Sequence, residues 1–215
     1  MRSKVKNYGR RSGALWITLG LLLIAAALFL ASYNLYDGLR AGRSAGETVE
    51  VLEGDIDAKA EPGEAEQQAQ DEEQPLPGYL LSPYMEMPVK SVDGVDYIGV
   101  LHIPSLGLEL PVISRWSYDD LRIAPCRYSG SAYLGNMVIC GHNYSAHFGK
   151  LKSLQPGDTV SFTDMDGNEF SYTVEELEVL RPTAVEEMTV GDWELTLFTC
   201  TLDGKSRVAV RCVQN

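Results

Sequence analysis

A cysteine and an arginine stand at the two ends of a short polar loop near the C-terminus. Cys200 ends the apolar run of residues 193–199, and Arg207 opens a second apolar run, residues 207–213. If the two runs pair as an antiparallel hairpin, Cys200 and Arg207 face each other across the loop mouth. A guanidinium beside a thiol favours the thiolate and can stabilise an oxyanion. This spacing indicates a cysteine nucleophile assisted by Arg207, because Arg211 lies about 13 Å further along the strand.

A cysteine nucleophile needs a partner that carries a proton, and the chain has three histidines. His102 lies inside an apolar strand-like run and is interpreted as structural. His142 directly follows the apolar run of residues 137–140, so it stands at a strand end, as Cys200 does. His147 enters a predicted helical stretch. The strand-end position therefore favours His142 over His147 as the acid/base. The opposing interpretation of Cys200 is a buried thiol without a chemical role.

Short strand-like segments fill the chain from about residue 79 onward. Apolar or alternating runs bounded by turn residues cover residues 97–103, 108–113, 137–140, 159–163, 169–180, 193–199 and 207–213. Short helical stretches are expected around residues 117–123 and 147–154. Many short strands at regular spacing predict an all-β domain with short helices, closed or nearly closed into a barrel.

The residues around these three candidates resemble the sortase family. The pentapeptide Thr196-Leu197-Phe198-Thr199-Cys200 matches the TLxTC signature of sortases. The segment around the sortase histidine is similar to Gly141-His142 followed by Phe148-Gly149, Leu151, Leu154 and Gly157-Asp158. Arg207 matches the sortase arginine, and the order His, Cys, Arg is the same. The resemblance extends over about residues 97–213.

This resemblance implies a fold, a reaction and partners. The fold would be the closed eight-stranded sortase-type β-barrel, and the reaction would be transpeptidation at an LPxTG-like sorting signal near the C-terminus of an exported protein. By analogy, Cys200 attacks the peptide carbonyl, Arg207 stabilises the oxyanion and His142 protonates the leaving amine. An amine of a peptidoglycan precursor or another protein then resolves the thioester. Thr199, beside the nucleophile, would line the substrate groove.

Two features bear on the subtype. The sequence shows neither a second apolar run near residue 215 nor an Asp-Pro-aromatic lid motif before the barrel, and both are expected of pilin-polymerising sortases. The resemblance therefore implies a protein-anchoring sortase with one membrane span, with class D as the candidate class.

The N-terminal region predicts a membrane anchor. Five basic residues lie among the first 12, and an uncharged apolar run of 18 residues follows at positions 14–31. A helix of that length spans roughly 27 Å, close to the hydrocarbon thickness of a bilayer. We expect a cytoplasmic basic segment at residues 1–13, a transmembrane signal-anchor helix at residues 14–36 and the rest of the chain outside the cell. The alternative, a cleaved signal peptide, usually has a shorter apolar region.

The segment after the apolar run is strongly acidic. Residues 44–76 hold eleven acidic residues against a single lysine, and the whole chain carries a net charge of -12. We expect an acidic extracytoplasmic tether at residues 37–78 and a catalytic barrel at residues 79–215. A short helix at residues 58–70 is the alternative for part of the tether. The negative charge argues against a nucleic-acid partner.

We expect neither a metal ion nor another cofactor from the remaining cysteines and the acidic loops. Cys126, Cys140 and Cys212 are interpreted as structural thiols, although an even number of exported cysteines also permits two disulfides. Glu186 and Glu187 are too few ligands for calcium, so no metal site is predicted. Two other functions stay open on the residues alone. One is a membrane-anchored cysteine hydrolase that passes the acyl group to water, and the other is a tethered β-barrel that only binds.

Overall fold

The computed structural model describes residues 9–60, 76–201 and 204–215. The chain divides into two compact units, residues 1–40 and residues 41–215, and each is described by itself.

One long helix, α1, runs from Gly9–Ala60 and belongs to both units. It is the one described helix that is long and apolar enough to cross a membrane, and its large apolar side chains between Leu15 and Leu39 are exposed. The predicted span at residues 14–36 lies within this helix.

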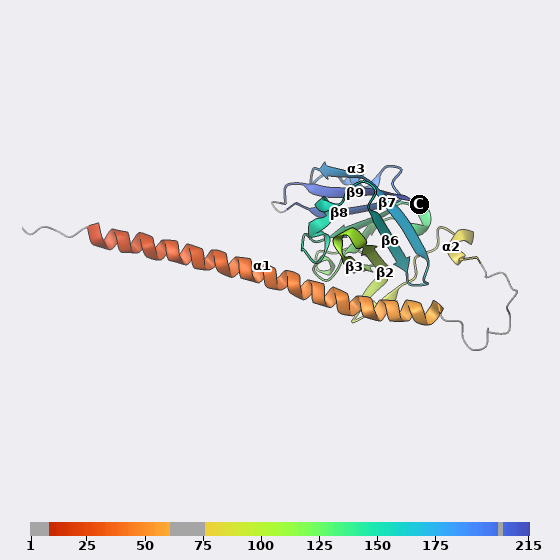
Figure 1. Cartoon of the computed structure of the whole chain (residues 1–215), viewed down its shortest axis with the longest axis horizontal. Coiled ribbons are helices and arrows are strands. Elements are labelled where there is room, and N and C mark those ends of the chain that lie inside the picture. Colours follow the sequence, from red (N-terminus) through yellow and green to blue (C-terminus); the bar gives the residue numbers. More distant parts are fainter. Residues whose placement is uncertain (1–8, 61–75, 202–203) are drawn as a thin grey trace, which may run out of the picture. The chain divides into compact units, whose positions relative to one another are not determined.

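The second unit is a barrel of short strands (Figure 1). The strands are β1 (Lys90–Val92), β2 (Val95–Ile103), β3 (Leu108–Ile113), β4 (Cys126–Ser129), β5 (Met137–Gly141), β6 (Thr159–Asp164), β7 (Glu169–Leu180), β8 (Leu195–Cys200) and β9 (Arg207–Gln214). The short helices are α2 (Gly78–Leu81), α3 (Val185–Thr189) and the 3-10 turns η1 (Pro104–Leu106), η2 (Asp120–Arg122), η3 (Ala132–Leu134) and η4 (Phe148–Ser153).

The strand order closes the barrel. The strands follow one another as β1-β2-β3-β4-β5-β8-β9-β7-β6, and β6 also pairs with β2. Eight strands, β2 to β9, therefore form a closed ring, and β1 is an added edge strand paired with β2. The predicted eight-stranded barrel is confirmed. The sequence analysis missed β1 and β4, which have three and four residues.

Three apolar cores stabilise this unit, and the smallest consists of Val138, Met188 and Ala209. The barrel interior holds the largest one, which includes Ile98, Leu101, Phe162, Tyr172 and Leu197. Inward-facing and outward-facing residues alternate along the strands with a period of two, and the irregularity of β2 between Tyr97 and Gly99 lets Ile98 and Leu101, three residues apart, face the same side. The second core lies on the outside of the barrel and includes side chains from α1.

The structure differs from the predicted tether over residues 41–60. Along this part of α1, five apolar side chains recur every three or four residues and are buried: Ala41, Ala45, Val49, Leu52 and Ile56. Their spacing forms one apolar helix face, whose Val49, Leu52 and Ile56 pack with Tyr97, Val100 and Ile113 of the barrel. The acidic residues of the segment occupy its other faces. The tether prediction failed here because a count of acidic residues does not register this periodicity.

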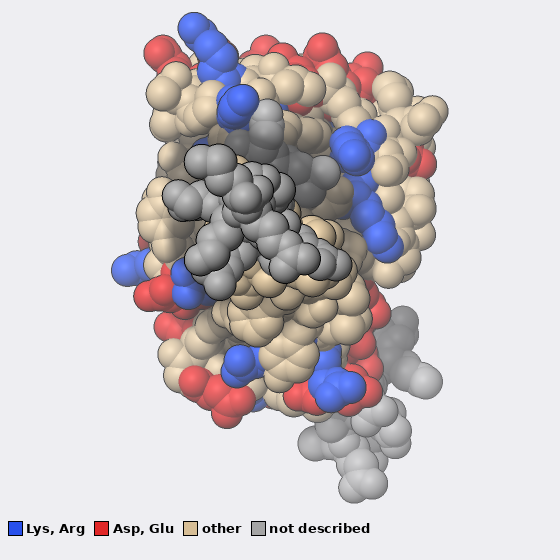
Figure 2. Space-filling model, turned by 90° about the vertical axis from the view of Figure 1, so that its left-hand side faces the viewer, with Lys and Arg blue, Asp and Glu red and all other residues tan. Residues whose placement is uncertain are grey.

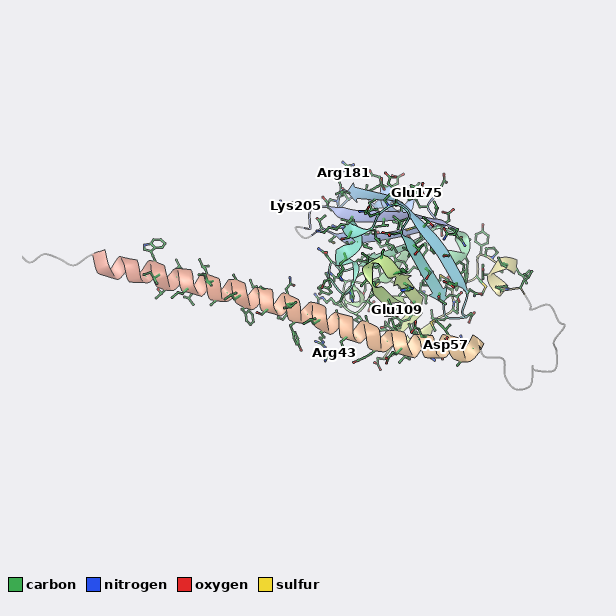
Figure 3. All side chains as sticks on the ribbon, viewed as in Figure 1. Arg43, Asp57, Glu109, Glu175, Arg181 and Lys205 are labelled. Atoms are coloured by element: carbon green, nitrogen blue, oxygen red, sulfur yellow. The ribbon has the colours of Figure 1, made fainter. Side chains whose placement is uncertain are left out.

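Polar contacts fasten the end of the same segment, which we call the docked segment (residues 41–60). Lys59 Nζ donates to Met165 O at 2.6 Å and pairs with Asp166 at 3.2 Å. Lys90 Nζ pairs with Asp55 at 2.6 Å and holds the pKa of that carboxyl below its usual value. Figure 3 shows Asp57 on the last turns of α1, on the side of the barrel that carries Glu109. Residues 61–75 of the predicted tether lie outside the described residues.

Candidate active site

Strand register places Cys200 opposite Arg207. Strands β8 and β9 are antiparallel, and Cys200 and Arg207 are their last paired residues before the connecting loop. This confirms the predicted hairpin and its register. The Arg207 guanidinium donates to the carbonyl of Ser206 at 3.1 Å, and the side chain is half-buried.

A second register brings His142 to the same end of the barrel. Strands β5 and β8 are parallel, and Gly141 pairs with Thr199. His142 directly follows Gly141 and Cys200 directly follows Thr199, so the two residues come next to each other at the ends of neighbouring strands. Neighbouring strands lie about 4.8 Å apart. The Thr199 hydroxyl donates to Gly141 O at 2.8 Å and ties the two strand ends together. The barrel thus gathers all three predicted catalytic residues at one end.

The histidine stands on a tightly folded loop, residues 142–147, which we call the histidine loop. Phe148 N donates to His142 O at 3.1 Å, and His147 N donates to Tyr144 O at 3.0 Å. The Phe148 ring packs directly on Gly141, where an added Cβ would lie 2.6 Å from it. The Tyr144 ring stacks on His142 with ring centres 4.5 Å apart. The sequence analysis missed Tyr144, and its aromatic side chain two residues after His142 was the available signal.

His147, the less favoured alternative, is not placed for acid/base work. Its side chain is fully buried, and neither ring nitrogen has a hydrogen-bond partner among the described residues. Burial, and secondarily the nearby His142, lowers the pKa of His147 to about 4. It is therefore neutral near pH 7.

The four cysteines are free thiols in two environments. Cys200 is exposed, whereas Cys126, Cys140 and Cys212 are buried. Burial raises the pKa of Cys140 and of Cys212 to about 12, and it raises the pKa of Cys126 as well. The burial of the three thiols is what the predicted structural role requires. Only Cys200 is open to an electrophile.

Two cavities meet at Cys200. We call the first the apolar cavity: it measures about 250 Å³ and contains Cys200 and Arg207 together with Trp116, Tyr118, Leu121, Tyr128, Cys140, Arg181, Pro182, Ala184, Val185, Met188 and Phe198. We call the second the polar cavity: it measures about 340 Å³ and is lined by Asn143, Gly149, Lys152, Thr199, Cys200, Thr201 and Val208. Thr199 thus borders the site, but its hydroxyl is engaged by Gly141.

The charged residues that line the two cavities are all basic. They are Arg181 and Arg207 in the apolar cavity and Lys152 in the polar one. Figure 3 shows Arg181 and Lys205 at the same end of the barrel, on the β7–β8 and β8–β9 connections. On the face drawn in Figure 2, basic side chains lie in separate places between acidic and uncharged ones. The local positive charge therefore favours a thiolate and an oxyanion within a chain of net charge -12.

Arg211 is a second arginine whose position the sequence did not reveal. Its side chain is 3% exposed and pairs with Glu178 at 2.7 Å. Its guanidinium also donates to Glu187 O at 2.6 Å and to Met188 O at 3.2 Å, both on α3. Because Met188 lines the apolar cavity, Arg211 fixes one wall of that cavity to the barrel. An arginine at an alternating position of an otherwise apolar strand was the available signal.

The described residues contain no group of three or more His, Cys, Asp or Glu side chains that could hold a metal ion. Glu187, one of the two acidic residues weighed for calcium, pairs instead with Arg181 at 3.5 Å.

Comparisons with known proteins point to one family. A family profile described as "Sortase domain" matches residues 101–215, slightly more than half of the chain. Sortase A of Bacillus anthracis is 32% identical over 124 residues, which cover 51% of this chain and 55% of that protein. The match thus spans little more than half the length of this relative.

Solved structures share the fold. A sortase D5 transpeptidase of Clostridium perfringens superposes with a TM-score of 0.56 at 22% identity, covering 80% of this chain and 99% of that one. A C. perfringens sortase C solved with the C-terminal cell wall sorting motif gives a TM-score of 0.51 at 22% identity, covering 79% and 90%. At this identity the likeness establishes the barrel fold.

Proposed function

Because the chain belongs to the sortase family, we propose that it is a membrane-anchored cysteine transpeptidase in which Cys200, His142 and Arg207 carry the reaction. The observation that supports this most is the meeting of the three residues at one barrel end by two independent strand registers. Cys200 is also the only exposed one of the four thiols, and it borders both cavities.

The first half-reaction forms a thioester. The Cys200 thiolate attacks the carbonyl carbon of the scissile peptide bond, and the carbonyl oxygen becomes an oxyanion that Arg207 stabilises. The C–N bond then breaks as His142 gives its proton to the leaving amine. The N-terminal part of the substrate stays on Cys200 as an acyl group.

The second half-reaction transfers this acyl group. An acceptor amine attacks the thioester carbon and loses its proton to His142, and Cys200 leaves as the thiolate. The products are a new amide and the enzyme in its starting protonation state. We infer that the acceptor is a peptidoglycan precursor or another protein, as the family resemblance implies.

The apolar cavity suits the acyl donor. Its aromatic and aliphatic walls fit the leucine and proline of an LPxTG-like sorting signal, and Cys200 and Arg207 lie at its border. Thr199 supports the site by holding the ends of β8 and β5 together. One solved relative contains a C-terminal cell wall sorting motif, which agrees with this class of donor.

We propose a single-pass topology with residues 1–13 in the cytoplasm and the barrel outside the cell. The basic start and the apolar part of α1 support it. A membrane-impermeant maleimide should label Cys200 in right-side-out vesicles and not in sealed inside-out ones. If Cys200 in right-side-out vesicles reacted only after the vesicles were lysed, this topology would be contradicted. A mature chain that lacks α1 would contradict it as well.

Peptide transfer tests the activity itself. The full-length protein in detergent is incubated with LPxTG-type peptides and an oligoglycine amine, and the products are identified by mass spectrometry. We expect an acyl adduct on Cys200 and an amide product that increases with amine concentration. A carboxylic acid at every amine concentration would indicate a hydrolase, and unchanged peptide across the library would indicate a binding module.

A further inference from the structure

The start of the docked segment presses on the histidine loop. A Cβ added to Gly42 would lie 2.8 Å from the Cβ of Ala146, closer than real Cβ atoms come to one another. Ala41 and Ala45, on either side of Gly42, are 6% and 2% exposed. Helix and loop therefore come close together at Gly42, where a side chain on the helix would collide with Ala146.

The contact continues through the loop to His142. Next to Ala146 stands His147, whose ring is fully buried. The ring of Tyr144 lies 5.6 Å from that of His147 and stacks on that of His142 at 4.5 Å. The rings of His147 and Tyr144 thus lead from the helix contact to the proposed acid/base.

The helix is the fixed partner in this contact. The docked segment is held by the buried side chains of Val49, Leu52 and Ile56 and by the Lys59 and Asp55 ion pairs. The histidine loop lies outside the strand ladder and is folded on itself by turn hydrogen bonds, such as that from Gly149 N to Tyr144 O at 2.8 Å. A steric change at the contact is therefore expected to displace the loop.

We propose that Gly42 is a positioning residue, whose close contact with Ala146 lets the docked segment set the histidine loop so that His142 lies beside Cys200. The inference rests on the proposed function, in which His142 is the acid/base. It makes residues 41–45 a part of the catalytic unit rather than a spacer. Displacement of a reacting group by about 1 Å can cost about 10²-fold in rate.

The test compares two glycines one helical turn apart in the full-length chain. Gly42→Ala adds a methyl group against Ala146, whereas Gly46→Ala adds one where no atom lies within 4 Å. Both replacements raise helix propensity equally. We expect Gly42→Ala to lower kcat for peptide transfer at least about tenfold, with KM little changed. Gly46→Ala should keep wild-type kcat.

Rescue separates positioning from a general loss of structure. In Gly42→Ala with Ala146→Gly the added methyl group takes the place of the removed one, so most of kcat should return. The imidazole signals of His142, followed by NMR, should shift in Gly42→Ala and return in the double variant. If Gly42→Ala does not fold, Ala146→Val probes the same contact from the loop, with Ser145→Val at an exposed neighbour as its control.

The possible failures are distinguishable. If Gly42→Ala, or Ala146→Val in its place, transfers peptide as fast as its control while His142→Ala is inactive, the positioning role of Gly42 is wrong and the proposed function stands. If Gly42→Ala loses kcat and the added Ala146→Gly does not restore it, the positioning role of Gly42 is also wrong. If His142→Ala keeps full activity, the proposed function itself fails.

Discussion

The two halves of the candidate active site are built in different ways. Cys200 and Arg207 are paired residues of one hairpin, so the hydrogen-bond ladder of β8 and β9 sets their relation. His142 stands just beyond the end of β5, on a loop that contacts a helix about 100 residues earlier in the chain. The first half depends on local pairing, and the second depends on a long-range contact.

This difference separates what is robust in the site from what is adjustable. A strand ladder resists small displacements because moving one residue changes the register of all. A loop outside the ladder can shift without unfolding the barrel. We therefore expect changes near Cys200 and Arg207 to act through chemistry and changes near His142 to act also through geometry.

The largest effect should come from the nucleophile. Cys200→Ala should lower transfer and cleavage by at least about four orders of magnitude, because no thioester can form. In the wild-type protein, alkylation without reductant should modify Cys200 first and the three buried thiols only after unfolding. Peptide mapping by mass spectrometry measures both. Faster alkylation of Cys140 or Cys126 would contradict the assigned exposure.

His142→Ala should be nearly as severe. A positioned acid/base contributes about 10² to 10⁴ in rate, because the leaving amine needs a proton. A pre-activated substrate whose leaving group needs no proton should recover part of the loss in His142→Ala but none of it in Cys200→Ala. Equal loss with both substrates would argue against the acid role.

Arg207→Ala should lower kcat by about 10² to 10³ if the guanidinium holds the oxyanion. Arg207→Lys should stay poor, since an ammonium does not replace a planar fork of donors. Because Arg207 is a residue of the ladder, neither variant should change the melting temperature by more than a few degrees. Full activity in Arg207→Ala together with an inactive Arg211→Ala would show that Arg207, the residue paired with Cys200, is not the arginine that stabilises the oxyanion.

Arg211→Ala should act on binding rather than on chemistry. The variant releases α3, whose Met188 lines the apolar cavity, so KM for the donor peptide should rise about tenfold with a smaller change in kcat. It also leaves the half-buried Glu178 without its ion-pair partner and removes the buried donor to two carbonyls of α3, and we expect about 1 to 3 kcal/mol of destabilisation. Steady-state kinetics and urea unfolding check the two parts. A fall in kcat at unchanged KM would place Arg211 in the chemistry instead.

The smallest effect concerns acid stability. Burial holds the pKa of His147 to about 4 in the folded protein, against an ordinary value of 6.5. Between these two pH values the unfolded chain binds more protons, so this residue lowers stability as the pH falls from 6.5 towards 4. The loss should reach about 2 to 3 kcal/mol near pH 4.5. Urea unfolding of wild type and His147→Leu at several pH values measures it, and parallel pH profiles would contradict it.

Much of the barrel was predictable from local pattern. The ranges predicted for β3 and β7 match the structure, those for β2, β5, β6 and β9 differ by one or two residues at one end, and that for β8 differs at both ends. β4 was missed because it has four residues, half of them polar. It is joined to β3 at a single residue pair, Ile113 with Cys126, so its neighbours rather than its own residues make it a strand.

The N-terminal region shows the opposite case. An apolar run predicts a spanning helix by length and composition, and the described helix agrees. The docked segment carries a periodic apolar face, yet nothing in its residues says which surface covers that face. Its partner is the outer side of β2 and β3, formed by residues about 50 positions later.

By itself, the sequence determined the residues able to do chemistry, their order and the hairpin that pairs Cys200 with Arg207, because turn chemistry and a two-residue period are local properties. Only the tertiary structure decided that His142 stands beside Cys200, that Arg211 anchors α3 and that the acidic segment packs on the barrel. Each of these depends on a parallel pairing or a packed face between distant segments. Such contacts exist only once barrel closure has brought those segments together.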